Sequence, residues 1–454
     1  MLIEDVIHRF KGLPPAPRLT DPDTVKRLYR QWRIRMMYST FIGYALFYFC
    51  RKNISIALPA LGTDLELTNV QLGLFGTMLY VVYGFGRFIN GFLADKANPR
   101  YFMSVGLFFS ALMNLFFGLS SATWCLALFW GLNGWFQSMG FPPCAKMLAN
   151  WYSVSERGTN WAIWHSSHQL GGFIIAILAG FLVQHYGWRM GFYVPAALCF
   201  LTAIFLFNRL RDTPVSMGLP PIAEYHGEVE YNQDGTVVDD EYESIRHTLF
   251  HRVLNNKHIW LMSFMTLFCY IIRFGTFDWA TKFLVEVKGS SIVKAGIVVS
   301  MIELVGILGP LTAGLITDKL WGGKRAPWCV ICFLLTIVGL TVFYFVPPGN
   351  PYIDALALSL IGFFIYGPQF LQGPFLADLA SRKAASTANG LAGVFSYAGA
   401  ALSGVGTGYF LDTYGWGGGF AFWGVAALCG ALISATLWNV KGANHSSVRL
   451  AKAS

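Results

Sequence analysis

The chain has 454 residues, of which 55% are hydrophobic, 16% aromatic and only 13% charged. Soluble globular proteins carry about 25% charged residues, so this composition excludes an ordinary soluble enzyme. The net charge is +9, but no basic run with interleaved aromatic residues points to nucleic acid as a partner. We therefore interpret the excess positive charge as a signal that sets membrane topology. The expected partner is the lipid bilayer.

Apolar runs of about 20 residues, the length that crosses a bilayer, recur along the chain. The first six predicted spans lie at 38–60, 70–94, 101–119, 122–147, 158–184 and 189–207. Six more lie at 258–283, 293–316, 327–346, 353–376, 384–410 and 416–438. The pattern predicts an all-α membrane protein with twelve transmembrane helices.

One long polar stretch, rich in proline and acidic residues, separates the two sets. The predicted domains are a basic amphipathic N-terminal segment at 1–37, a six-helix half at 38–207, a linker at 208–257, a second six-helix half at 258–440 and a tail at 441–454. The first residues, MLIEDVIHRFKG, contain no apolar stretch that resembles a cleaved signal peptide.

Basic residues orient the chain, because they are enriched in cytoplasmic loops. Residues 1–37 carry eight lysines and arginines, whereas the loop after the first span carries Asp64 and Glu66 and no base. This asymmetry, together with an even number of spans, predicts that both termini are cytoplasmic. Three lysines on the predicted outer side disagree with the rule: Lys282, Lys288 and Lys294.

A loop motif occurs twice, once after the second span of each set. The run GFLADKANPR, with Asp95 and Arg100, is matched by GLITDKLWGGKR, with Asp318 and Arg325. A repeat at this offset indicates two parallel halves related by an axis along the membrane normal, around a central cavity. The four charged residues are candidates for loops that control conformation.

The repeat places two arginines at equivalent depths. Arg51 precedes Asp95 by 44 residues and Arg273 precedes Asp318 by 45 residues. Both arginines then lie about 20 Å from the cytoplasmic end of a span, at 1.5 Å per residue. Because an arginine there costs about 2.5–3.5 kcal/mol on insertion, it is a functional candidate by default. A structural ion pair or snorkelling to the interface is the alternative.

Other polar residues recur near these arginines at helical spacing. Asp278 follows Arg273 by five residues and is a candidate local partner, and Arg87 lies two turns before Asp95. Tyrosines share a helix face with each arginine at spacings of three or four: Tyr44 and Tyr48 with Arg51, Tyr83 with Arg87, and Tyr270 with Arg273. A tyrosine at helical spacing is more often a packing residue, and this alternative stays open.

His165 and His168 lie one turn apart in the fifth predicted span. Two histidines without a third ligand do not favour zinc, and the Cys329–Cys332 pair lacks a second ligand pair, so no metal and no cofactor are predicted. Arginine forks match phosphate oxygens, and intramembrane acids are few, Glu303 being the clearest. The residues therefore favour a dianionic solute such as a phosphate ester.

Several runs together resemble the organophosphate:inorganic phosphate antiporters of the major facilitator superfamily, nearest the hexose-phosphate carrier and sensor branch. The runs are GYALFYFCRKN, YGFGRFINGFLADKANPR, ERGTNWAIWHSSHQLGG, RDTPVSMGLPPIAEY, YIIRFGTFDW, IYGPQFLQG and GLAGVFSYAGA. The resemblance covers residues 30 to 440. It implies a bacterial inner-membrane protein that is not an enzyme, with sugar phosphate and inorganic phosphate as partners, and we expect a monomer.

The resemblance also implies roles for single residues. Arg51 and Arg273 match the arginines that hold phosphate, and His168 matches a binding-site histidine. Cavity-lining tyrosines of the family match Tyr44, Tyr48, Tyr83, Tyr270, Tyr366 and Tyr397. Arg87 stands where relatives commonly have lysine, and Asn389 and Ala392 replace an acid and lysine pair of some hexose-phosphate carriers. Candidates for specificity or coupling are Lys52, Glu303, Asp278 and Asn389.

The predicted function is exchange of a phosphorylated sugar, with glucose-6-phosphate favoured, for inorganic phosphate. A glycerol-3-phosphate antiporter and a transporter-like sugar-phosphate sensor are the alternatives, and a proton-coupled symporter is a further one. An intramembrane hydrolase is not favoured, because no span combines a nucleophile, a base and an orienting acid.

Overall fold

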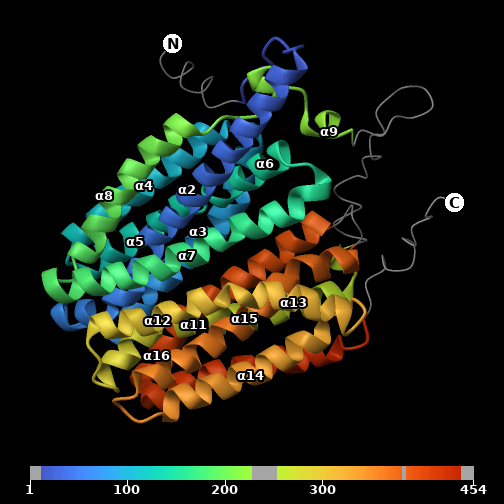
Figure 1. Ribbon diagram of the computed structural model, residues 1–454. Helices are drawn as coiled ribbons and strands as arrows, with labels where there is room; N and C mark the ends of the chain where they lie inside the picture. The colour runs from blue at the N-terminus through green and yellow to red at the C-terminus, as the bar shows by residue number, and fades with distance from the viewer. Residues whose placement is uncertain (1–11, 228–252, 381–384, 441–454) are drawn as a thin grey trace. The chain divides into compact units, whose positions relative to one another are not determined.

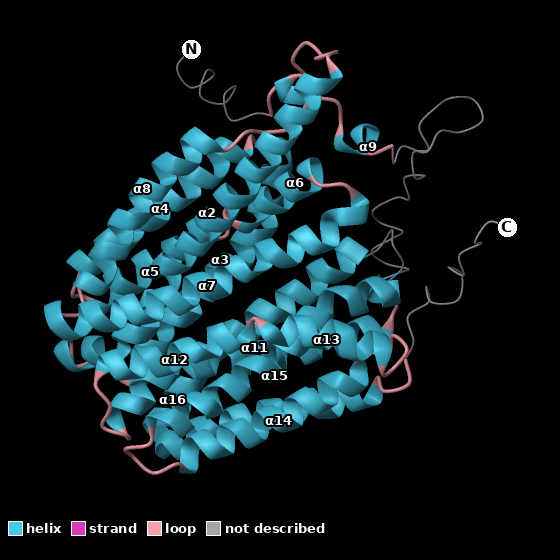
Figure 2. Ribbon diagram, viewed as in Figure 1, coloured by secondary structure: helices cyan, strands magenta, loops and turns pink. Residues whose placement is uncertain are grey.

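The computed structural model describes residues 12–227, 253–380 and 385–440 (Figure 1). Within these ranges the chain forms helices and no strand (Figure 2). Most of the predicted linker with its acid-rich run (228–252), the start of the N-terminal segment (1–11) and the predicted tail (441–454) lie outside the described residues.

The helices follow one another with short connections. In the first part of the chain they are α2 (Pro22–Asp64), α3 (Asn69–Lys96), α4 (Pro99–Leu119), α5 (Thr123–Gln137), α6 (Phe141–Trp151), α7 (Val154–Tyr186), α8 (Met190–Arg209) and the short α9 (Ile222–Tyr225). The second part contains α11 (Lys257–Glu286), α12 (Ile292–Gly306), α13 (Leu308–Lys319), α14 (Ala326–Phe345), α15 (Pro351–Ala380) and α16 (Ala385–Thr436). Each of the twelve predicted spans falls on these helices, to within a few residues, so the predicted all-α membrane fold is confirmed.

Nine helical stretches of the described residues are long and apolar enough to cross a membrane. This number is consistent with twelve spans for three reasons. The helix α16 contains two predicted spans, and α5 and α6 share one and are each too short alone. The apolar run of α2, a continuous helix, is interrupted by the polar residues from Arg51 to Asn53.

Two predicted spans are broken inside, and proline explains both breaks. The helix α6 begins just before Pro142 and Pro143, which fit the first turn of a helix because they have no N–H to leave unsatisfied. Between α12 and α13 the break falls at Ile307, where the ring of Pro310 would clash with the carbonyl of Gly306 in a continuous helix.

The long α16 contains the predicted turn between the last two spans. Gly415 adopts φ 65° and ψ −165°, a conformation that side chains with a Cβ rarely tolerate. The chain therefore changes direction at this glycine, between the predicted spans 384–410 and 416–438.

Contacts divide the chain into two compact units. Unit 1 consists of Met1–Asn53, Phe85–Ile175 and Arg189–Glu241, and unit 2 of Ile54–Gly84, Ala176–Trp188 and Tyr242–Ser454. The helices α2, α3 and α7 thus contribute one part to each unit. The division along the chain into halves at 38–207 and 258–440 stays a prediction, and the two units are described separately below.

Two of the three lysines that disagree with the positive-inside rule are neutralised in unit 2. Lys288 forms an ion pair with Asp354, with both side chains almost fully buried, and also donates to the carbonyl of Phe343 at 2.7 Å. Lys282 pairs with Glu286 one turn further along α11. Each ion pair is neutral as a whole, which lowers the cost of burying these two lysines. The predicted orientation of the chain stays a prediction.

Candidate functional site

In unit 1 the middle of α2 carries the first candidate arginine. Arg51 is buried, with 5% of its surface exposed, and its guanidinium carbon lies 5.3 Å from the centroid of the Tyr48 ring. The ring of Tyr44 lies one turn earlier, 5.8 Å from that of Tyr48 between centroids. The three side chains thus form the contiguous polar and aromatic face that their spacing predicts, and the ring faces stabilise the cation.

The helix α7 brings His168 to this face. Its ring centroid lies 5.3 Å from that of Tyr48 and 6.5 Å from that of Tyr44. His168 Nδ1 is hydrogen-bonded to the carbonyl oxygen of His165, and because a carbonyl only accepts, Nδ1 carries the hydrogen. Nε2 is therefore the nitrogen that can take up a second proton, which is the chemistry expected beside a phosphate.

A glycine sets the distance between α7 and α2. A Cβ at Gly171 would lie 2.4 Å from the carbonyl oxygen of Ala45 and 2.9 Å from its Cα. These atoms belong to a helix backbone and cannot rotate away. Gly171 thus allows the close approach that places His168, one turn earlier, against the tyrosines of α2.

Gly171→Ala is expected to push α7 away from α2 and to move His168 with it. Overpacking of this kind destabilises by about 1–3 kcal/mol, so the melting temperature of the purified protein should fall and phosphate should bind more weakly. Gly158→Ala on the same helix is the matched control, because a Cβ there meets no atom within 4 Å. Equal melting temperatures for Gly171→Ala and Gly158→Ala would contradict the packing role.

Arg87 lies further along unit 1, on α3. Its side chain is half-buried, and its guanidinium carbon lies 5.0 Å from the centroid of the Phe141 ring. Trp164 connects this region to the Arg51 face, because its ring centroid lies 5.8 Å from that of Phe141 and 4.8 Å from that of Tyr44. Trp164 and Phe141 were not predicted as site residues, because in the sequence they are ordinary aromatic residues of apolar segments.

A buried polar network behind Arg51 was also missed from the sequence. The amide groups of Asn114 and Asn133 donate to the carbonyl oxygen of Cys50 at 3.0 and 2.7 Å, and that of Gln137 donates to the carbonyl of Phe47 at 2.9 Å. These bonds hold the turn of α2 that carries Arg51 against α4 and α5. Lone amide side chains inside apolar runs were the signal that could have indicated the network.

In unit 2, Arg273 of α11 is surrounded by aromatic rings. It is buried, with 6% of its surface exposed, and its guanidinium carbon lies 4.7 Å from the Tyr366 ring centroid and 4.8 Å from that of Phe274. The Tyr270 ring is further away, at 6.0 Å. Arg273 Nη2 also donates to the Tyr366 hydroxyl oxygen at 3.2 Å. The predicted neighbours Tyr270 and Tyr366 therefore do lie around this arginine.

Glu303 of α12 joins the same cluster. The Tyr366 hydroxyl donates to Glu303 Oε2 at 2.5 Å, so the three side chains form a chain of hydrogen bonds from Arg273 through Tyr366 to Glu303. Gly362 allows α15 to approach α12 here, since a Cβ would lie 2.3 Å from the carbonyl oxygen of Ile302. The intramembrane acid is thus connected to Arg273 through a tyrosine.

The remaining candidate tyrosines of unit 2 contact one another. The ring of Tyr397 on α16 lies 4.7 Å from that of Tyr83 on α3 and 6.1 Å from that of Tyr270, between centroids. All three are buried, with at most 8% of their surface exposed. The structure therefore connects Tyr83, Tyr397 and Tyr270 to the surroundings of Arg273.

Asp278, the predicted local partner of Arg273, makes hydrogen bonds to other parts of unit 2. Its two carboxylate oxygens accept from Ser55 Oγ at 2.7 Å and from the Tyr80 hydroxyl at 2.8 Å. These bonds connect α11 to α2 and α3 within the unit. The sequence gives no signal that would pair residues separated by about 200 positions.

Two further candidates for specificity lie in different surroundings. Lys52, next to Arg51, is almost fully buried, with 1% of its surface exposed. Asn389 of α16 is half-buried, and its Oδ1 lies 3.9 Å from where a Cβ of Gly373 would be. Their roles stay predictions.

The two copies of the loop motif differ in their charge contacts. In unit 2, Arg325 Nη1 lies 3.6 Å from Asp318 Oδ1. In unit 1, Arg100 donates through Nε to the carbonyl of Phe207, at the end of α8. The backbone carbonyl of Asp95 accepts from Lys146 Nζ at 3.1 Å.

Lys146, which sequence reasoning missed, caps the end of α3. Its Nζ also donates to the carbonyl of Ala97 at 2.8 Å and lies 3.7 Å from a carboxylate oxygen of Asp212. A cation at a helix C-terminus is favourable because the last carbonyls carry partial negative charge.

The cysteines and histidines form no metal site in the part of the chain that the structure describes. No group of three or more His, Cys, Asp or Glu residues there could hold an ion, and the eight cysteines are free thiols. Arg51 belongs to unit 1 and Arg273 to unit 2. Their action on one shared phosphate stays a prediction.

Comparison with known proteins assigns the family. The model for the Major Facilitator Superfamily matches residues 40–373. This chain belongs to the major facilitator superfamily. The family consists of transport proteins, which agrees with the prediction that the chain is not an enzyme. The chain is a multi-pass membrane protein.

Relatives place this major facilitator protein in the organophosphate:inorganic phosphate antiporter branch. It is 42% identical to a "Probable hexose phosphate transport protein" of Chlamydia pneumoniae, over 94% of this chain and 96% of the relative. It is 36% identical to the "Membrane sensor protein UhpC" of Escherichia coli (93% and 96% covered) and 36% identical to the "Glycerol-3-phosphate transporter" of Bacillus subtilis (97% and 100%).

A solved structure supports the fold of the major facilitator superfamily independently. The bacterial homolog of the human lysosomal transporter Spinster, in an inward-facing and unoccupied conformation, aligns with a TM-score of 0.68 at 16% identity, covering 89% of this chain and 95% of the other. At this identity the likeness concerns the fold alone.

Proposed function

We propose that this protein is an antiporter that exchanges a phosphorylated sugar, with glucose-6-phosphate preferred, for inorganic phosphate by alternating access. The observation that carries the proposal is the pair of buried arginines at repeat-equivalent positions, Arg51 and Arg273, each against aromatic rings. The names of the relatives support phosphorylated solutes as the substrate class.

The chemistry of these side chains suits a phosphate group. Each guanidinium can present two parallel N–H donors to phosphate oxygens, which a lysine cannot do. Tyrosine hydroxyls at 44, 48 and 270 add neutral donors, and His168 Nε2 can share a proton with a phosphate whose second pKa is about 6. A bound anion compensates the positive charges of both arginines, so we expect each half of the transport cycle to require an anion.

Other parts of the proposal concern topology and conformational control. We place the protein as a monomer in a bacterial inner membrane, with both termini cytoplasmic. The loops with Asp95, Arg100, Asp318 and Arg325 are proposed to change their contacts as the halves rock. Lys52, Asp278 and Asn389 are proposed to tune specificity or coupling.

Two alternatives have specific support. The 36% identity to a glycerol-3-phosphate transporter supports a smaller organic group, and the 36% identity to a membrane sensor protein supports a receptor that binds without transport. A sensor would bind phosphate esters with the same arginines, so binding alone does not distinguish the two functions.

Counterflow in proteoliposomes tests the proposal. Vesicles loaded with unlabelled phosphate should take up labelled phosphate, and external glucose-6-phosphate should inhibit this uptake at lower concentration than glycerol-3-phosphate. Stronger inhibition by glycerol-3-phosphate would select the first alternative. Binding of the ester without any counterflow would select the sensor, and uptake driven by a pH gradient without internal phosphate would identify a symporter.

A further inference from the structure

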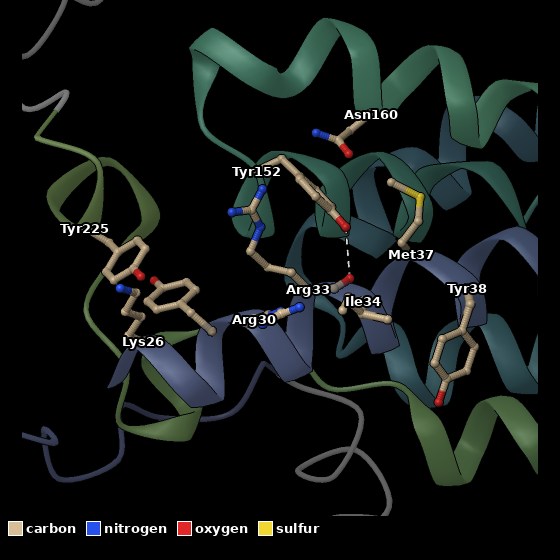
Figure 3. Close-up of a pocket in the computed structure, with 10 residues that line it drawn as sticks. Lys26, Arg30, Arg33, Ile34, Met37, Tyr38, Tyr152, Asn160 and Tyr225 are labelled. Carbon is tan, nitrogen blue, oxygen red and sulfur yellow. Dashed lines mark hydrogen bonds between the residues drawn. The ribbon is translucent and has the colours of Figure 1, made fainter. Parts of the chain in front are cut away.

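Unit 1 contains a second basic and aromatic pocket, separate from the Arg51 face. It has a volume of about 530 Å³ and is lined from α2 by Lys26, Arg30 and Arg33, from the end of α6 by Tyr152, and from α9 by Tyr225 (Figure 3). The proposed transport function uses none of these residues.

The residues that line the pocket include three cations and no carboxylate. Among the described residues, Arg33 pairs with Glu156 through Nη2 and Oε2 at 2.5 Å, and Glu224 of α9 pairs with Arg18. Partial burial opposes ionisation of Glu156, but the hydrogen bond from Arg33 holds the pKa of this carboxyl below its usual value. Lys26 and Arg30 add two exposed cations to the lining.

The aromatic wall of the pocket is held in place by several contacts. The rings of Tyr29 and Tyr225 stack with centroids 4.1 Å apart, and the Tyr29 hydroxyl donates to the carbonyl of Pro220. On the other side, the Tyr152 hydroxyl donates to the carbonyl of Arg33 at 2.9 Å (Figure 3). The guanidinium of Arg33 also lies over the Tyr152 ring. The pocket is therefore formed by side chains with defined partners.

An exposed apolar stripe continues from the cations along α2. Lys26, Arg30, Ile34 and Met37 share one helix face, because at 3.6 residues per turn they fall within about 80° of rotation. On this face Lys26 and Arg30 are followed by Ile34, which is 58% exposed, and by the half-buried Met37. Ile34 lies just before the predicted span at 38–60, so the change from charged to apolar surface along α2 fits the level of the lipid headgroups.

We propose that this pocket binds the phosphate headgroup of an anionic phospholipid, such as phosphatidylglycerol, with an acyl chain along Ile34 and Met37. The lipid belongs to the leaflet on the side of the N-terminal segment, which we expect to be cytoplasmic. A soluble phosphate would pair with the cations equally well but would not contact the apolar residues next to them. The combination of the two features on one helix face therefore favours the lipid.

Lipid titration followed by native mass spectrometry tests the proposal on the full-length protein. In detergent, dioleoyl-phosphatidylglycerol should bind to the wild type, whereas dioleoyl-phosphatidylcholine should bind far more weakly. The double variant Lys26→Gln/Arg30→Gln should bind phosphatidylglycerol about 30-fold more weakly, from the usual contribution of two basic residues near a lipid surface. Arg27→Gln removes a neighbouring exposed cation that does not line the pocket. It should weaken binding by at most about 5-fold, the contribution of one basic residue near a lipid surface.

Two further arms separate the sources of phosphate and exclude misfolding. Ile34→Ser should weaken phosphatidylglycerol binding, and millimolar inorganic phosphate should not displace the lipid; displacement would identify a site for soluble anions and overturn the proposal. Equal lipid binding by the double variant and the wild type would also overturn it. The melting temperatures of all variants without added lipid should agree, so that a loss of binding reports on the pocket.

Discussion

Arg51→Lys and Arg273→Lys are each expected to reduce phosphate exchange by about 10- to 100-fold or more. A hydrogen bond to a charged group contributes about 1.5–3 kcal/mol, and lysine replaces a planar fork by a single point charge. Arg273 also lies over the rings of Tyr366 and Phe274, where a planar guanidinium packs better than an ammonium. The measurement is the initial rate of labelled-phosphate counterflow per reconstituted molecule.

The control for this experiment is Arg27→Lys, which makes the same chemical change at an exposed position of α2. It should exchange phosphate at the wild-type rate. Near-normal exchange by both Arg51→Lys and Arg273→Lys would disprove their assignment to the phosphate site. Loss of phosphate exchange in only one of the two variants would show that a single arginine, from one unit, binds the phosphate.

Tyr366→Phe is expected to lower phosphate affinity by about 10-fold while the protein still folds. The substitution keeps the ring beside Arg273 but removes the hydroxyl that accepts from Arg273 and donates to Glu303. Without this hydroxyl the guanidinium is less well oriented toward a phosphate. The loss should appear as a higher phosphate concentration at half-maximal counterflow.

The relay of hydrogen bonds is tested by combining Tyr366→Phe with Glu303→Gln. If Glu303 acts on Arg273 through Tyr366, the double variant should lose no more affinity than the single Tyr366→Phe variant. Additive losses would mean that Glu303 acts by a separate route. Tyr352→Phe is the matched control, because this tyrosine begins the same helix and is 89% exposed.

Helix positions and candidate charges could be predicted from the sequence because the bilayer restricts both. A span needs about 20 apolar residues, so the twelve segments are visible as runs. A charge inside such a run is costly, so Arg51, Arg273 and Glu303 stand out without any structure. The repeated loop then relates the two arginines to one another by position alone.

Contacts between helices could not be predicted in this way, because they depend on how each helix is rotated and how closely it approaches its neighbour. The amide of Asn133 reaches the carbonyl of Cys50 across 83 positions, and Tyr366 reaches Glu303 across 63. Gly362 permits the second of these contacts by letting two backbones meet. No periodicity in a single segment contains this information.

The sequence by itself thus determined the spans, the family and the buried charges, since each follows from local composition or from short motifs. Only the tertiary structure decided which side chains those charges meet: Tyr48 for Arg51, and Tyr366 with Glu303 for Arg273. It also revealed the pocket beside Arg33, whose walls come from three separate stretches of the chain. The physical reason is that the cost of burying a charge is local, whereas the side chains that compensate it are brought together by packing.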